Sequence, residues 1–272
     1  MRPRIDKNTV LRYLGYSGQA IDDNLMSRID SLIHQCEDNE DAKSVARYFD
    51  ITKNTGDLVL LKDSSLELKG KDVSRHLTGC VGCILFACTL GTQVNTNITT
   101  LNAMSVLDGV IYNAAASDLI DQASNVEHKR LSDDFRAQGL ILGRRYSPGY
   151  GDFPIDCQGA LLRELMASKK IGLFVTRAGM LAPTKSITAV IGVRKGNALG
   201  SVGAGVEGDA RGAVGAGVEG EVRGAVGAGV EDDATVPRNS HDKAGVSVER
   251  SSCKSCAANK SCTFLKNGNF CN

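Results

Sequence analysis

Arg144-Arg145-Tyr146-Ser147-Pro148-Gly149-Tyr150-Gly151-Asp152-Phe153-Pro154 is the run with the strongest structural signal in this chain. Pro148 fixes its own φ at about −65°, and Gly149 and Gly151 reach backbone angles closed to other residues, so the segment predicts a tight turn. The same segment offers a ligand a guanidinium fork, a flat aromatic ring and backbone donors. On these residues alone, a ligand-binding loop and an ordinary surface turn remain equally open.

Apolar periodicity predicts a mixture of helices and strands on both sides of this turn. The expected strands cover residues 45–51, 57–61, 79–88, 139–143, 171–176 and 186–193. The expected helices cover residues 6–16, 20–36, 72–77, 98–126 and 158–168. Because they mix without a strict βαβ alternation, the pattern predicts an α+β domain with a twisted, mainly antiparallel sheet flanked by helices.

The composition changes after residue 198. Residues 199–250 hold 12 of the 30 glycines and no aromatic residue, and near-identical twelve-residue units begin at Val202, Val214 and Val226. A solenoid is one interpretation, but small valines between glycines give no face worth stacking, so a disordered, flexible linker is favoured. The expected organisation is a domain over 1–198, a linker over 199–250 and a cysteine-rich tail over 251–272.

Charge and hydropathy exclude two classes of protein. The chain has 32 Lys and Arg against 31 Asp and Glu, so it lacks the basic surface of a nucleic-acid-binding protein. No apolar run reaches the ~18 residues that a membrane-spanning helix needs, and the polar N-terminus lacks an apolar signal region. We therefore expect a cytoplasmic protein with neither nucleic acid nor membrane as a partner.

The nine cysteines are clustered, which in a cytosolic chain indicates metal or redox chemistry rather than disulfides. Four of them form a set in the tail: Cys253, Cys256, Cys262 and Cys271. Four thiolates suit tetrahedral zinc or an iron–sulfur cluster, with free thiols as the alternative. Cys80, Cys83 and Cys88 lie in an apolar run, where they are expected to be small buried hydrophobes.

Several blocks of this sequence resemble the activation domain of cobalamin-dependent methionine synthase, and more closely the stand-alone activation proteins of that family. The blocks are Ser-Pro-Gly-Tyr-Gly-Asp-Phe-Pro at 147–154, the segment 180–192, and the group formed by 70–73, His76-Leu77 and 87–91. Residues 10–16 also fit, so the resemblance spans residues 5–198 together with the cysteine-rich end.

The resemblance implies a binding site for S-adenosylmethionine. Arg145 aligns with the family's arginine, which implies that it grips the carboxylate of this cosubstrate, a task that suits a planar fork of donors. Arg144 is interpreted as an ordinary surface arginine. The residues implied to wall the ligand are Ser147, Pro148, Gly149, Tyr150 and Gly151. A Tyr150 that only packs against the helix from Gln158 remains an alternative.

A second loop is implied to line the same cleft. Its residues are Thr184, Lys185 and Ser186, and a solvated Lys185 is the alternative.

Two departures from the family pattern affect the ribose and adenine contacts. Gly151-Asp152 stand where the methionine synthase domain carries a cysteine after its Gly-Tyr-Pro, and Asp118 stands close to where the family places a glutamate.

The resemblance implies reactivation of cobalamin by reductive methylation. An electron from a donor such as flavodoxin or ferredoxin and a methyl group from S-adenosylmethionine restore methylcobalamin. The chain lacks an Asp-x-His-x-x-Gly cobalamin motif, so the cobalamin is expected on a partner, a methionine synthase protein. No catalytic acid or base is expected, because positioning is the main contribution. The alternatives are another corrinoid-dependent methyltransferase component, a non-catalytic S-adenosylmethionine-binding module and an iron–sulfur electron carrier.

Overall fold

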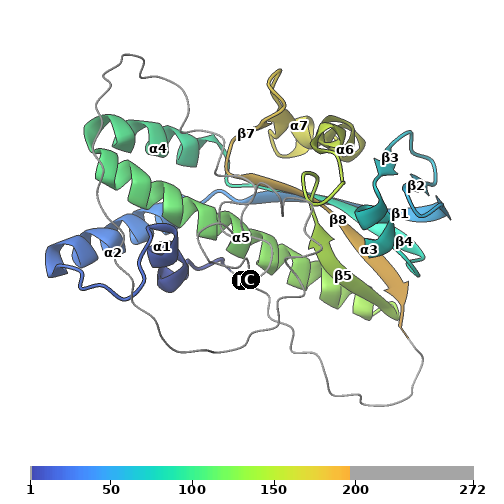
Figure 1. Ribbon diagram of the computed structural model, residues 1–272, viewed down its shortest axis with the longest axis horizontal. Helices are drawn as coiled ribbons and strands as arrows, with labels where there is room; N and C mark the ends of the chain where they lie inside the picture. The colour runs from blue at the N-terminus through green and yellow to red at the C-terminus, as the bar shows by residue number, and fades with distance from the viewer. Residues whose placement is uncertain (1, 197–272) are drawn as a thin grey trace, which may run out of the picture. The chain divides into compact units, whose positions relative to one another are not determined.

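The computed structural model describes residues 2–196, which form an α+β unit with one main sheet (Figure 1). The main strands are β1 (Lys43–Asn54), β2 (Leu58–Leu61), β3 (Glu67–Lys69), β4 (Gly82–Thr89), β5 (Leu140–Tyr146) and β8 (Ser186–Lys195). Their order is β3-β2-β1-β4-β8-β5, and every neighbouring pair is antiparallel. The expected fold class is therefore confirmed.

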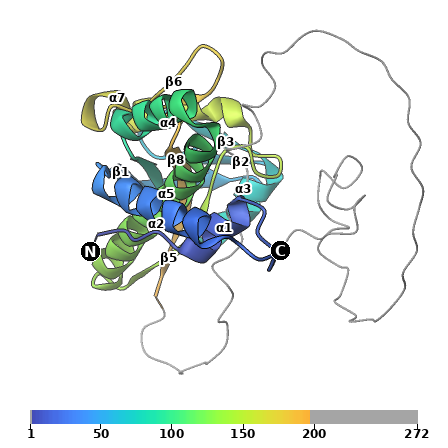
Figure 2. The ribbon, with the colours of Figure 1, turned by 90° about the vertical axis from the view of Figure 1, so that its left-hand side faces the viewer.

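Helices cover both faces of this sheet (Figures 1 and 2). They are α1 (Lys7–Tyr13), α2 (Asp23–Asp38), α3 (Lys71–His76), α4 (Thr92–Met104), α5 (Val106–Arg136), α6 (Gln158–Leu165) and α7 (Ala167–Lys170). A short 3-10 turn, Ile155–Cys157, precedes α6, and β6 (Phe174–Val175) pairs with β7 (Leu181–Ala182) in a separate small sheet. In Figure 1, α1, α2 and α5 lie below the sheet, and α6 and α7 lie above it.

The central strand β4 supplies both hydrophobic cores. All eight of its residues are buried. Ile84, Phe86 and Cys88 belong to the core shared with α1, α2 and α5, whereas Cys83 and Leu85 belong to the core shared with α6. This division follows from the two-residue period of a strand. Burial of Cys83 and Cys88 is confirmed, while Cys80 is half-buried.

The single helix expected over residues 98–126 is wrong, because the structure has two helices there. Ser105 has extended backbone angles (φ −156°, ψ 112°) between α4 and α5, and its hydroxyl accepts the Asp108 backbone N–H at 3.4 Å. A serine at this position caps a new helix N-terminus. The strand expected over 171–176 shrinks to Phe174–Val175, and β3 has no counterpart among the expected strands.

The corner between α4 and α5 depends on a glycine. A Cβ added at Gly109 would lie 2.8 Å from the Cα of Asn102, where no real Cβ is found. We expect Gly109→Ala to lower the free energy of unfolding by about 1–3 kcal/mol, because the helices must separate. Thermal unfolding should show a melting temperature lower by about 2–10 °C. An unchanged melting temperature would contradict this close approach.

The sheet topology brings the two predicted loops to one end of the sheet. Strand β5 is an edge strand that pairs only with β8, and its register shifts between Leu142 and Arg145. Tyr146, at the end of β5, lies opposite Val190, four residues after β8 begins at Ser186. The loop after β5 and the loop before β8 therefore lie next to each other.

Candidate functional site

Arg145 extends from the edge strand β5 onto helix α5. Its Nη1 donates to the backbone carbonyl of Ser124 at 2.9 Å, and its Nη2 donates to Oδ1 of Asn125 at 2.8 Å. Burial lowers the pKa of its guanidinium, while the negative charge of Asp121 opposes that shift. The guanidinium is therefore held against the protein rather than pointing into bulk water.

Asp121 of α5 carries the carboxylate next to this arginine. Burial raises the pKa of Asp121 to about 7. The positive charges of Arg145 and Lys185 oppose the rise, and the negative charge of Asp118 adds to it. A carboxyl group that titrates near neutrality beside a half-buried arginine is a feature of ligand-binding and catalytic sites more than of ordinary surface helices.

Lys185 approaches the same helix from the other loop. It is buried, with 9% of its surface exposed, and its Nζ donates to the Ser117 hydroxyl at 2.9 Å. The solvated alternative for Lys185 is therefore wrong. Two cations far apart in the sequence, one from strand β5 and one from the loop before β8, thus act on one carboxylate, Asp121, in the middle of α5.

The neighbours of Lys185 hold their loop in place through hydrogen bonds within the protein. The Thr184 hydroxyl donates to Oδ1 of Asn95 in α4 at 2.9 Å. The Ser186 hydroxyl donates to the Pro183 carbonyl at 2.7 Å and lies 2.8 Å from the Thr89 hydroxyl. These bonds fix the direction in which the lysine between them extends.

The glycine-rich loop packs on the opposite face of β5 from Arg145, because consecutive strand residues alternate. Tyr146 stacks on His76 and on Phe153, with ring centroids 5.1 and 6.1 Å apart. Its hydroxyl donates to the Tyr150 carbonyl at 3.2 Å, and the two tyrosine rings lie 6.3 Å apart. Pro148 is buried. Tyr150 thus packs beside Tyr146 of β5.

The departure from the family pattern at Gly151-Asp152 has a local structural reason. Gly151 has φ 54°, and a Cβ there would collide with the Asp72 carboxylate and lie 2.8 Å from the Tyr146 hydroxyl. The Asp152 carboxylate accepts the backbone N–H groups of Lys71 at 2.7 Å and Asp72 at 2.9 Å. These two residues therefore attach the loop to the first turn of α3.

Asp118 lies away from Arg145, on the side of α5 that faces the N-terminal segment. Its carboxylate accepts the backbone N–H of Asp6 at 2.7 Å and the side chain of Gln122 at 3.3 Å, and it is 2% exposed. The residue that sequence reasoning does not identify is Asp121. The sequence gives one indication of its role. Asp121 is a charged residue on the apolar stripe of the long helix, because it lies seven positions, or two helical turns, after the buried Ala114.

The four tail cysteines, Cys253, Cys256, Cys262 and Cys271, lie outside the residues that the structure describes, so the metal site stays a prediction. The same holds for the linker over 199–250. Within residues 2–196, no three His, Cys, Asp or Glu side chains gather closely enough to hold a metal ion. Over this same range, no helix is both long and apolar enough to cross a bilayer.

Comparison with known proteins supports the resemblance at the level of fold and not of sequence. No protein-family model and no curated protein matches the chain. Among solved structures, the chain is similar to the "MetH Reactivation Domain bound to AdoHcy", with a TM-score of 0.53 and 13% identity. The match covers 72% of this chain and 76% of that chain. The described unit therefore shares the fold of a methionine synthase reactivation domain.

Proposed function

We propose that this protein binds S-adenosylmethionine at the end of β5 and supports reductive methylation of cobalamin carried by a methionine synthase partner. The observation that carries the proposal is the convergence of Arg145 and Lys185 on Asp121, at the sheet edge that also bears the glycine-rich loop. The fold neighbour was solved with AdoHcy bound, which is the product of methyl transfer from S-adenosylmethionine.

The charges at this site match those of the ligand. The amino-acid end of S-adenosylmethionine carries a carboxylate and an ammonium group, and its sulfonium carries a further positive charge. Arg145 and Lys185 supply the positive partners for the carboxylate, and Asp121 supplies the negative partner for the ammonium. Thr184 and Ser186 hold Lys185 in position. The loop Ser147 to Gly151 packs mainly on the other face of β5, so it is proposed to contact the ligand only at the sheet edge, where the loop leaves the strand.

The chemistry asks the protein for positioning. One electron, from a donor such as flavodoxin or ferredoxin, reduces the partner's cobalt(II). The reduced cobalt then takes the methyl group as the S–CH₃ bond breaks, and AdoHcy leaves. Because cobalt is the nucleophile, this chain needs no general base, and orientation of the sulfonium methyl is its main contribution.

The decisive experiment titrates the full chain with S-adenosylmethionine and with AdoHcy. Binding is measured by calorimetry and by intrinsic tyrosine fluorescence. We expect saturable binding of both ligands below millimolar concentration, with a change in tyrosine emission because Tyr146 and Tyr150 lie beside the loop. ATP, which shares the adenosine but lacks the amino acid, is the matched control and should bind at least tenfold more weakly. No binding at millimolar ligand would overturn the proposal.

A second measurement separates activation from binding alone. The protein is incubated with a cobalamin-loaded methionine synthase, a reductant and S-adenosylmethionine, and methylcobalamin is followed by its absorbance. Formation of methylcobalamin supports the activation role. Binding without methyl transfer would identify a non-catalytic module, and transfer only to another corrinoid protein would identify a different methyltransferase system.

The tail cysteines are proposed to hold zinc or an iron–sulfur cluster, which metal analysis of anaerobically purified protein tests.

A further inference from the structure

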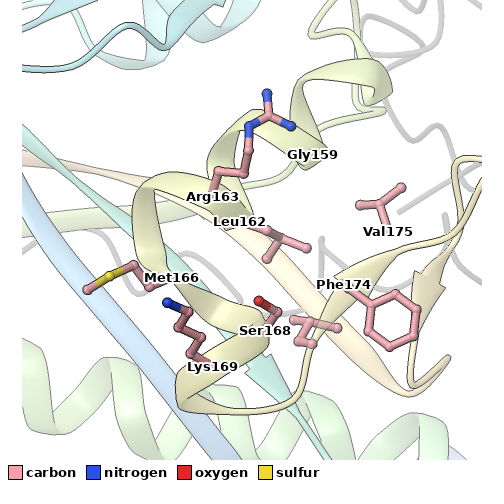
Figure 3. A pocket seen from close by; sticks show the side chains of 9 residues that line it. Gly159, Leu162, Arg163, Met166, Ser168, Lys169, Phe174 and Val175 are labelled. Atoms are coloured by element: carbon pink, nitrogen blue, oxygen red, sulfur yellow. The ribbon is translucent and has the colours of Figure 1, made fainter.

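A second concave site lies on the opposite side of the sheet from Arg145, between α6, α7 and β6 (Figure 3). Its volume is about 530 Å³, within the range of small-molecule sites. Leu162 and Leu173 form an apolar floor, since both are buried. Phe174 stands at the rim with 52% of its surface exposed. The depression therefore offers apolar and aromatic contact to a ligand.

The charged residues that line this depression are both cations. Arg163 of α6 and Lys169 of α7 line it, and no aspartate or glutamate does. Neither side chain makes a hydrogen bond or an ion pair with any other residue in the described range 2–196. The adjacent Glu164 faces elsewhere, where its carboxylate accepts the Ser64 hydroxyl at 2.7 Å and lies 3.7 Å from Arg47. The lining of the depression thus carries two positive charges and no negative charge.

An unusual backbone conformation shapes the depression. Met166, between α6 and α7, has φ 52° and ψ 37°, a left-handed conformation that a residue with a side chain adopts only at a cost. This residue separates α6 from α7, and Arg163 and Lys169 line the depression from these two helices, with their charged ends at different ends of it (Figure 3). Strained residues of this kind occur preferentially at ligand sites.

We propose that this depression binds a small organic anion, with an aromatic or aliphatic body against Leu162, Leu173 and Phe174 and a carboxylate, sulfonate or phosphate group beside one of the two lining cations, Arg163 or Lys169. The apolar floor selects the body, and the two cations select the negative charge. The site is separate from Arg145, Asp121 and Lys185 of the proposed S-adenosylmethionine site, because the sheet lies between α6 and α5.

The test uses 8-anilinonaphthalene-1-sulfonate as the anionic probe on the full chain, with its uncharged analogue N-phenyl-1-naphthylamine for comparison. We expect saturable fluorescence enhancement by the anionic probe and at least tenfold weaker binding of the neutral one. The double variant Arg163→Glu, Lys169→Glu should weaken binding of the anionic probe at least tenfold. Lys170→Glu, an exposed neighbour in α7 that does not line the depression, is the matched control and should change binding less than twofold.

All three positions are exposed, so the variants should fold, which far-UV circular dichroism and thermal unfolding verify. The proposal would be overturned by equal binding to the double variant and the wild type, or by equal affinity for the two probes. Loss of the signal in Leu107→Ser instead would assign the probe to the exposed apolar residues Met104, Val106, Leu107 and Val110 at the α4–α5 corner. S-adenosylmethionine binding should be unchanged in the Arg163 and Lys169 variants, so failure here leaves the proposed function standing.

Discussion

Replacing Arg145 with alanine is expected to weaken S-adenosylmethionine binding about 10- to 100-fold, because a hydrogen-bonded pair between charged groups contributes about 1.5–3 kcal/mol. The substitution also removes the positive charge of Arg145, which lowers the pKa of Asp121 in the wild type. Calorimetric titration of the variant with S-adenosylmethionine measures the effect. AdoHcy, which has the same carboxylate but no sulfonium, should lose a similar factor.

The matched control is Arg144→Ala, the preceding residue of the same strand. Its side chain is exposed, and its neighbour Arg145 is the one that contacts α5. We expect Arg144→Ala to change the affinity by less than about twofold. Arg145→Lys keeps the charge but loses the planar fork, so it should recover only part of the affinity. Equal binding by Arg145→Ala and the wild type would remove the arginine from the site.

Asparagine in place of Asp121 should stabilise the protein at pH 8 and weaken its ligand binding. The pKa of Asp121 is about 7 in the folded protein, above its ordinary value of 3.8, so the folded state binds the proton more tightly than the unfolded state. The free energy of unfolding therefore falls as pH rises from about 4 to 7 and levels off above 7. The neutral amide of the variant would mimic the protonated carboxyl at every pH. We expect Asp121→Asn to be more stable than the wild type at pH 8 by about 1–3 kcal/mol, discounted for partial exposure.

The same carboxylate gives ligand binding a predicted pH dependence. If the ionised Asp121 binds the ammonium group, then the Kd for S-adenosylmethionine should rise about tenfold as the pH falls from 8 to 6. The reason is that the ionised fraction of Asp121 falls about tenfold for each pH unit below its folded pKa. Other groups near this site also titrate or carry charge: Asp118, His128, Arg145 and Lys185. Asp121→Asn separates them, since it should bind weakly and show no such slope.

Calorimetry from pH 5.5 to 8.5 and chemical unfolding over pH 4–8 measure these two effects on the same samples. A purely structural Asp121 would change the stability profile and leave the Kd at pH 8 unaltered. If the variant kept wild-type affinity and wild-type pH dependence, Asp121 would have no part in binding. Higher stability combined with weaker binding is the expected compromise at a functional site.

Much of the fold could be predicted because its signals are local. The long apolar stripe of α5 follows from the period of 3.6 residues in a helix. The break at Ser105 also has a local signal that the apolar periodicity obscures, since a serine three residues before Asp108 is a helix-capping pattern. Strand β3 has three residues, too few for periodicity to identify, and it forms because β2 pairs with it.

The candidate site could be predicted only in part. The motifs identified Arg145 and the loop with Lys185, because these residues stand in recognisable sequence patterns. They did not identify Asp121, since its one signal, a charged residue on the apolar stripe of α5, indicates no particular chemistry. Its proximity to both cations arises when α5 packs across β5 and the start of β8.

The sequence by itself predicts the α+β class and the glycine-containing turn after β5. Both depend on backbone angles and side-chain periods, which are properties of neighbours along the chain. Packing is what directs Arg145 to α5 and Tyr146 to α3, and what lets Asp121 hold its proton up to about pH 7. Desolvation and Coulomb interactions depend on which groups are near in space, and packing brings those groups together from distant parts of the chain.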